Sequence, residues 1–158
     1  MPKDVGRLFK CSARSAFALN PVFINIQAVS GSSEFEDEIE QAKDEFDNQE
    51  RIDYYKISTW KRNILKKIFN NRYDQLKKDK ELQKWIDANA WAKGYCAYAM
   101  LKAQNGESSW KDWKKYQNPT AEDIEKLWSK NQKEMLYQAW MQFIAEMQFT
   151  AAVNEISK

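Results

Sequence analysis

Glycine and proline are scarce in this chain, with only 4 Gly and 3 Pro among its 158 residues. A β-sandwich or β-barrel of this length needs many tight turns, and those turns rely heavily on these two residues. Hydrophobic residues make up 43% of the chain and aromatic residues 14%, which is enough apolar material to form a core. The sequence therefore predicts one all-α domain rather than a β-fold or a disordered chain.

Apolar residues at helical spacing predict an irregular bundle of about four main helices. We expect these helices at about 34–48, 53–76, 81–104 and 121–156. Thr120 and Asp123 have the spacing of a capping box, which is a specific signal for the start of the last helix. The tryptophan-rich stretch 108–116 is expected to be a short helix or a loop.

The predicted domains are an extended basic arm, 1–33, and a helical domain, 34–158. Residues 5–33 contain no acidic residue but carry Arg7, Lys10 and Arg14. A basic start that lacks acids and contains serine resembles a mitochondrial transit peptide. The sequence thus predicts an uncleaved targeting segment and a mitochondrial location. The alternative is an ordinary basic arm, docked on a partner, in a cytoplasmic protein.

Within the arm, the run from Pro21 to Val29 has the period-two pattern of a strand, with Val22, Ile24 and Ile26 on one side. A lone strand has no partner for its backbone hydrogen bonds, and unpaired backbone groups are costly when buried. We therefore expect an extended segment that pairs with another chain or lies across the helices. These three side chains form the first half of a predicted partner-binding surface.

The last predicted helix is apolar around most of its circumference from Met135 onward. A thin polar line interrupts it, at Asn131, Glu134, Gln138, Gln142, Glu146, Thr150 and Asn154. A helix at the surface of a globular protein needs a narrower apolar face than this. The helix is therefore either the centre of its own bundle or half-buried in another protein. The second half of the predicted partner-binding surface lies here, at Trp140, Met141, Phe143, Ile144 and Met147.

Charge is unevenly distributed, although the net charge is only +2. Segment 34–53 has a net charge of −8 and segment 54–102 a net charge of +8. These two blocks can neutralise each other in the fold or face outward as two docking surfaces. The Lys- and Trp-rich region 84–116, or the acidic helix, supports an alternative function as a small nucleic-acid-binding or inhibitory protein.

No specific catalytic signature is present. The chain has no His, no Gly-rich phosphate loop, no GxSxG motif and no CxxC motif. The lack of His removes the commonest general base and the commonest metal ligand. Its only cysteines, Cys11 and Cys96, are expected to be reduced and inert. We therefore expect no catalytic residues, no cofactor and no metal site.

The sequence also lacks a run of about 20 apolar residues, so no transmembrane segment is expected, although peripheral contact with a membrane is left open. Together these features predict a non-enzymatic protein. Its expected role is that of an accessory or structural subunit of a larger assembly, such as a mitochondrial complex. Its expected partners are other protein subunits, with nucleic acid as the second choice.

Overall fold

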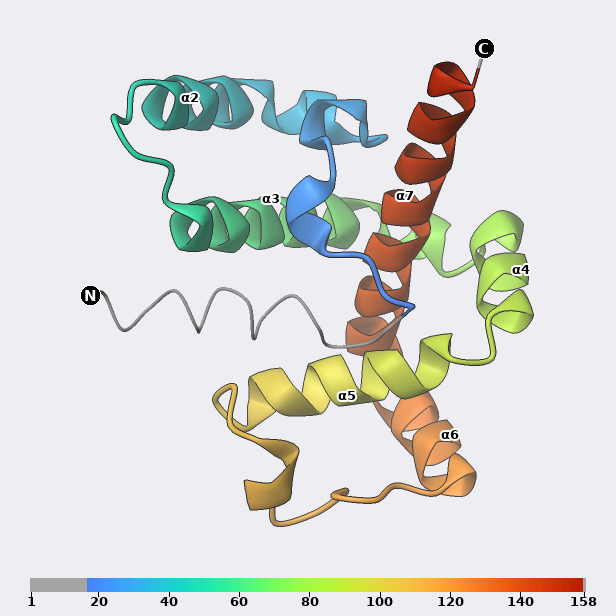
Figure 1. Ribbon diagram of the computed structural model, residues 1–158. Coiled ribbons are helices and arrows are strands. Elements are labelled where there is room, and N and C mark those ends of the chain that lie inside the picture. Colours follow the sequence, from blue (N-terminus) through green and yellow to red (C-terminus); the bar gives the residue numbers. More distant parts are fainter. Residues whose placement is uncertain (1–16, 158) are drawn as a thin grey trace.

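The computed structural model describes residues 17–157, and this part of the chain is helical without a strand (Figure 1). Its α-helices are α2 (Glu36–Asp47), α3 (Tyr54–Leu76), α4 (Lys80–Ala88), α5 (Ala92–Gln104), α6 (Ala121–Lys130) and α7 (Gln132–Ile156). Four short 3₁₀ helices accompany them: η1 (Pro21–Phe23), η2 (Ile26–Ala28), η3 (Ser32–Phe35) and η4 (Trp110–Asp112). The predicted all-α class is confirmed.

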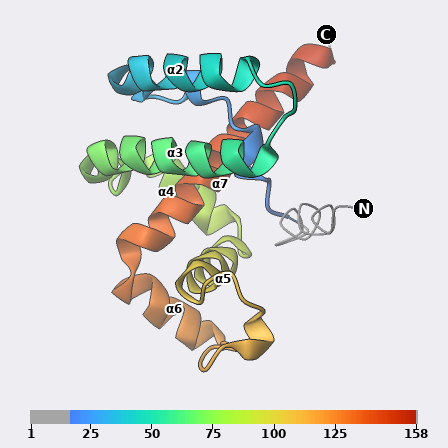
Figure 2. The ribbon, with the colours of Figure 1, turned by 90° about the vertical axis from the view of Figure 1, so that its left-hand side faces the viewer.

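Helix α7 runs along the height of the molecule and connects its two ends (Figures 1 and 2). Helices α2 and α3 lie side by side toward one end, and α5, α6 and η4 gather at the other. Helix α5 packs more extensively against α7 than any other pair of elements in the described chain. The first half of α7 is therefore the centre of the bundle, as one of the two sequence interpretations proposed.

Two of the four expected helices are each divided into two by an asparagine. Asn89 ends α4, where its side chain donates a hydrogen bond of 2.8 Å to the carbonyl of Trp85. Asn131 ends α6 in the same way, with a bond of 3.1 Å to the carbonyl of Leu127. An asparagine side chain competes with the backbone for these bonds and favours helix ends. The capping box of Thr120 and Asp123 is present at the start of α6.

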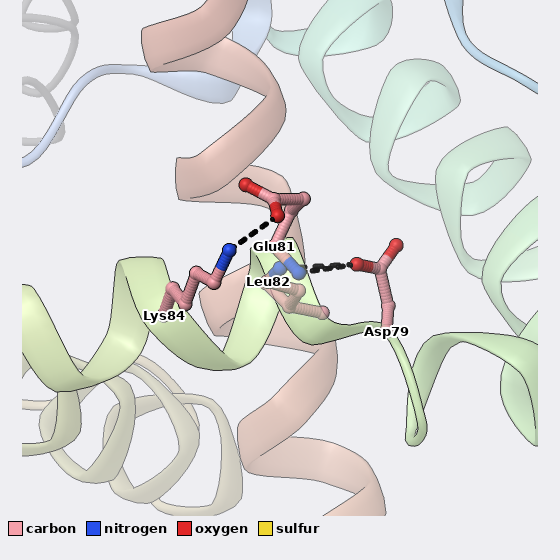
Figure 3. Close-up of polar contacts among 4 residues, drawn as sticks. All are labelled: Asp79, Glu81, Leu82 and Lys84. Atoms are coloured by element: carbon pink, nitrogen blue, oxygen red, sulfur yellow. Dashed lines mark hydrogen bonds and ion pairs between the residues drawn. The ribbon is translucent and has the colours of Figure 1, made fainter.

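Helix α4 begins directly after α3 because Asp79 caps it (Figure 3). One carboxylate oxygen of Asp79 accepts hydrogen bonds from the backbone N–H groups of Glu81, at 2.9 Å, and Leu82, at 3.1 Å. Lys84 forms an ion pair of 2.8 Å with Glu81 on the exposed face, and this contact raises the pKa of Lys84. The cap turns the chain, so that Trp85 reaches α7 and donates a hydrogen bond to its Glu146.

The N-terminal segment does not form the extended strand expected over 21–29, so this prediction was wrong. It forms the two 3₁₀ helices η1 and η2, in which Asn20 and Asn25 accept hydrogen bonds from the backbone N–H groups two residues on. An asparagine that bonds its own backbone in this way starts a turn, which overrides the β-propensity of the branched residues. Ile24 and Ile26 are nevertheless buried, in the core of this chain itself.

Glutamine side chains on α7 replace the strand partner that this segment lacks. The carboxamide of Gln142 accepts from the Leu19 N–H at 2.8 Å and donates to the Leu19 carbonyl at 2.9 Å. Gln148 makes the same pair of bonds to Asn25, at 2.8 and 3.0 Å. Lys61 on α3 donates to the carbonyls of residues 22 and 24. The segment therefore lies across α3 and α7, with its backbone groups satisfied by side chains.

The acidic and basic blocks of the sequence face each other across α2 and α3. Lys67 pairs with Glu38 at 2.8 Å, and Lys56 pairs with Glu45. These contacts are solvent-exposed, so each contributes little to stability, on the order of 0–1 kcal/mol. They favour the interpretation in which the two blocks neutralise each other.

Burial raises the pKa of two groups in the core. Cys96 is a buried free thiol on α5, and its pKa lies above its ordinary value of 9.0. Tyr137 on α7 donates a hydrogen bond of 2.8 Å to the carbonyl of Arg62, and desolvation raises its pKa above the ordinary 10.0. The second cysteine, Cys11, lies outside the described residues.

We expect these two groups to make the fold less stable at high pH. The folded state retains protons that the unfolded state releases, so their contribution is fully present below about pH 9 and is lost as the pH rises. Above its ordinary pKa, each group should lower the free energy of unfolding by about 1.4 kcal/mol for each pH unit. Urea unfolding between pH 8 and 11 would measure this slope.

Matched variants isolate the two groups. Tyr137→Phe should remove the part of the slope above pH 10, and Cys96→Ala the part that begins near pH 9. Burial lowers the pKa of Lys61, which makes the folded state more stable as the pH rises. This effect is the same in the parent and in both variants, so it does not alter the differences between them. Identical slopes in the parent and both variants would contradict the expectation.

Candidate functional site

A groove of about 260 Å³ lies between α5 and the segment that follows it. Its lining residues are Gly94, Ala97, Tyr98, Leu101, Trp110, Trp113, Tyr116, Gln117, Asn118 and Pro119. None of them is charged, although 30% of the chain consists of charged residues. The lining residues include four aromatic rings and two carboxamides. This is the composition of a small-molecule site, in which apolar walls carry a few polar groups.

The segment over the groove is held by its own hydrogen bonds. The turn that follows α5 contains Gly106, whose φ of 63° is the left-handed conformation that glycine favours. The carboxamide of Gln117 donates to the carbonyls of Lys111, at 2.7 Å, and Trp113, at 2.9 Å. Tyr116 adopts a φ of 61°, which is rare for a bulky residue. Strained backbone of this kind persists where the surrounding contacts fix it, often at binding sites.

Trp113 is the most buried residue of this segment, with 3% of its surface exposed. Its ring packs on Tyr98, with the two ring centroids 5.6 Å apart. Within residues 17–157, its indole N–H is the one buried side-chain polar group without a hydrogen-bond partner. An unpaired buried donor costs about 1–3 kcal/mol, and such a group calls for an explanation.

Two further aromatic side chains are accessible from solvent at this groove. Trp110 is 40% exposed, and the Lys111 ammonium lies 5.8 Å from the centroid of its ring. Tyr116 is exposed to a similar extent. The groove thus combines accessible ring faces with two carboxamides, and it suits a neutral ligand that has both apolar faces and hydrogen-bonding groups.

Two acidic side chains on α6 and two on α7 each have a basic or indole partner of their own. Glu122 and Glu125 lie together at an open concavity on α6, where they pair with Lys126 and Lys93, at 2.8 and 2.9 Å. The two carboxylates of the polar line on α7 have different partners. Glu134 pairs with Lys66, and Glu146 accepts a hydrogen bond from the indole N–H of Trp85.

Within residues 17–157, no group of three or more His, Cys, Asp or Glu side chains could hold a metal ion. No helix in the same range is long and apolar enough to cross a membrane.

The predicted partner-binding residues do not form one exposed surface. Ile24, Ile26, Trp140 and Met141 are buried within the chain; Val22, Phe143 and Ile144 are half-buried; Met147 is exposed. Contact of these residues with another protein stays a prediction. The basic targeting segment falls mostly on residues 1–16, which lie outside the described part of the chain.

Sequence reasoning missed the groove because it treated region 84–116 as one surface. In the fold, Trp85 bonds to α7, and the indole of Trp91 donates to Asn89 at 3.2 Å. Of the aromatic residues in this region, Tyr98, Trp110, Trp113 and Tyr116 line the groove. In the sequence, the last three of these aromatic residues are spaced three apart and are followed by the carboxamides of Gln117 and Asn118. That pattern was the signal by which the groove could have been predicted.

Comparison with known proteins identifies relatives of this chain. The sequence model of a family described as 4-alpha-glucanotransferase matches residues 11–158. The 4-alpha-glucanotransferase DPE2 of Oryza sativa subsp. japonica is 29% identical over 119 residues, which cover 73% of this chain and 12% of that protein. A 4-alpha-glucanotransferase of Clostridium butyricum is 29% identical over 131 residues, which cover 82% of this chain and 26% of that protein. No solved structure matches the chain significantly.

These matches overturn the functional prediction. The expectation of a non-enzymatic accessory or structural subunit of a mitochondrial complex is wrong, and so is the alternative of a nucleic-acid-binding or inhibitory protein, because the relatives are enzymes. The prediction rested on the lack of His and of any recognised catalytic motif. Glycosyl transfer ordinarily proceeds through a pair of Asp or Glu side chains and needs no His. The chain spans only 12% and 26% of the two relatives, so its own residues need not include that pair.

Proposed function

The chain belongs to the 4-alpha-glucanotransferase family, and we propose that it forms a helical part of an enzyme that transfers segments of α-1,4-linked glucan. The observation that carries this proposal is the family match, which extends over residues 11–158. The neutral aromatic groove agrees with it, because a glucan is an uncharged polymer with apolar ring faces and many hydroxyl groups.

We place the catalytic pair outside residues 17–157. Transfer with retained configuration uses two carboxyl groups about 5–5.5 Å apart, one as nucleophile and one as acid and base. The acidic side chains described above instead form ion pairs with lysines or cap helices, as Asp79 and Asp123 do. Bonds from Thr120 also lower the pKa of Asp123, which is opposite to what a general acid requires.

Incubation of the full-length protein that contains this chain with a short maltooligosaccharide tests the proposal. Transfer should produce both longer and shorter oligosaccharides while the number of reducing ends stays constant, because one glycosidic bond forms for each that breaks. Chromatography would measure the chain lengths, and a reducing-sugar assay the ends. Unchanged oligosaccharides, or a rise in reducing ends that matches the shortening, would contradict transfer activity.

A further inference from the structure

We infer that the groove beside α5 binds sugar units of an α-1,4-linked glucan, an inference that rests on the proposed function. Trp113, Trp110 and Tyr116 are the residues expected to make the contacts. Neither the family match nor the relatives assign a role to these residues.

The unpaired indole N–H of Trp113 is the first argument. Buried Trp N–H groups usually have a hydrogen-bond acceptor, and this one has none within the described chain. The nitrogen has less than 1 Å² of accessible surface, so a sugar hydroxyl or ring oxygen accepts from it only once a neighbouring group of the groove shifts aside.

The accessible aromatic faces are the second argument. A pyranose ring presents a patch of C–H groups on its faces, and an aromatic ring is the usual surface on which such a patch packs. Trp110 and Tyr116 provide two such rings at one groove. The double hydrogen bond of Gln117 holds the segment that carries both rings, and it leaves the oxygen of that carboxamide to accept from a hydroxyl.

The absence of charge from the lining is the third argument. A site for a phosphate or a nucleic acid needs cationic side chains in contact with the ligand. The ten lining residues contain none, while Lys111 lies against the ring of Trp110 rather than in the groove wall. A neutral polyol therefore fits the site better than an anion does.

Isothermal titration of the complete chain with a soluble maltooligosaccharide tests this inference. Trp110→Ala removes an accessible ring, and Trp113→Phe removes the N–H while it keeps most of the packing. Each should weaken binding about tenfold, which corresponds to about 1.4 kcal/mol. Phe149→Ala is the matched control: Phe149 is exposed and belongs to the C-terminal half of α7, which points away from α5 and α6 (Figure 1), so the affinity should not change.

Circular dichroism identifies variants that do not fold. If Trp113→Phe unfolds, Trp110→Ala still tests the inference, because Trp110 is accessible and its replacement should not disturb the core. Equal affinity of the parent and Trp110→Ala, or tighter binding of single-stranded DNA than of the glucan, would overturn the inference. If transfer activity is present but groove variants bind glucan normally, the groove inference fails and the proposed function stands. If the groove binds glucan but the full-length protein performs no transfer, the proposed function fails instead.

Discussion

Replacing Met141 by glutamate is expected to unfold the chain. Met141 is 1% exposed and lies in the first half of α7, the part that α5 covers. A carboxylate placed there loses its hydration without gaining a partner, which costs several kcal/mol. Domains of this size are stable by only about 5–15 kcal/mol. Circular dichroism and thermal melting would measure the loss.

Met147→Glu is the matched control, since Met147 is 59% exposed on the same helix. Its effect should stay within about 0.5 kcal/mol, as for most surface substitutions. If α7 instead presented Met141 to a partner protein, Met141→Glu would keep its helix content and melting midpoint. That outcome would contradict the burial described here.

Phe69→Ala should cost about 3–5 kcal/mol of stability. Phe69 is fully buried on α3 and contacts two rings of α7, with centroid distances of 5.4 Å to Tyr137 and 5.6 Å to Trp140. Its removal leaves a cavity where α3 crosses α7, and two large rings cannot close it. Urea unfolding would measure the free energy, with the exposed Phe23→Ala as a control that should change little. A loss below about 1 kcal/mol would show that this cluster does not join the two helices.

The features that the sequence predicted well are those determined by neighbours along the chain. The first two helices begin and end close to the predicted residues, because Asp53 caps α3 and an acidic first turn begins α2. The capping box at Thr120 involves residues only three apart. Local periodicity and caps therefore sufficed for the fold class and for most helix ends.

The features that it missed depend on contacts between distant segments. The turns near Ile24 are stabilised by Gln142 and Gln148, which lie more than one hundred residues along the chain. The groove joins α5 to a loop that folds back over it, which periodicity within either segment does not reveal. The polar line on α7 was visible in the sequence, but its partners were not.

The functional prediction failed for a different reason. It searched for a complete catalytic apparatus within one chain, whereas the matched regions cover only 12% and 26% of the two relatives. Under the proposed function, this chain supplies binding contacts, and its candidate site consists largely of aromatic and carboxamide side chains. These residues also occur in ordinary cores, so the stretch from Trp110 to Gln117 was not recognised as a candidate glucan site.

The indole N–H signals in a nuclear magnetic resonance titration test most directly whether this helical body contacts glucan. The chain has 7 Trp, so it has seven such signals. On addition of a maltooligosaccharide, the Trp113 signal should shift most, because its unpaired N–H gains an acceptor. Trp85 and Trp91, whose N–H groups already bond to Glu146 and Asn89, should stay in place. A Trp113 signal that stays fixed at saturating glucan, or equal shifts of all three, would contradict the account.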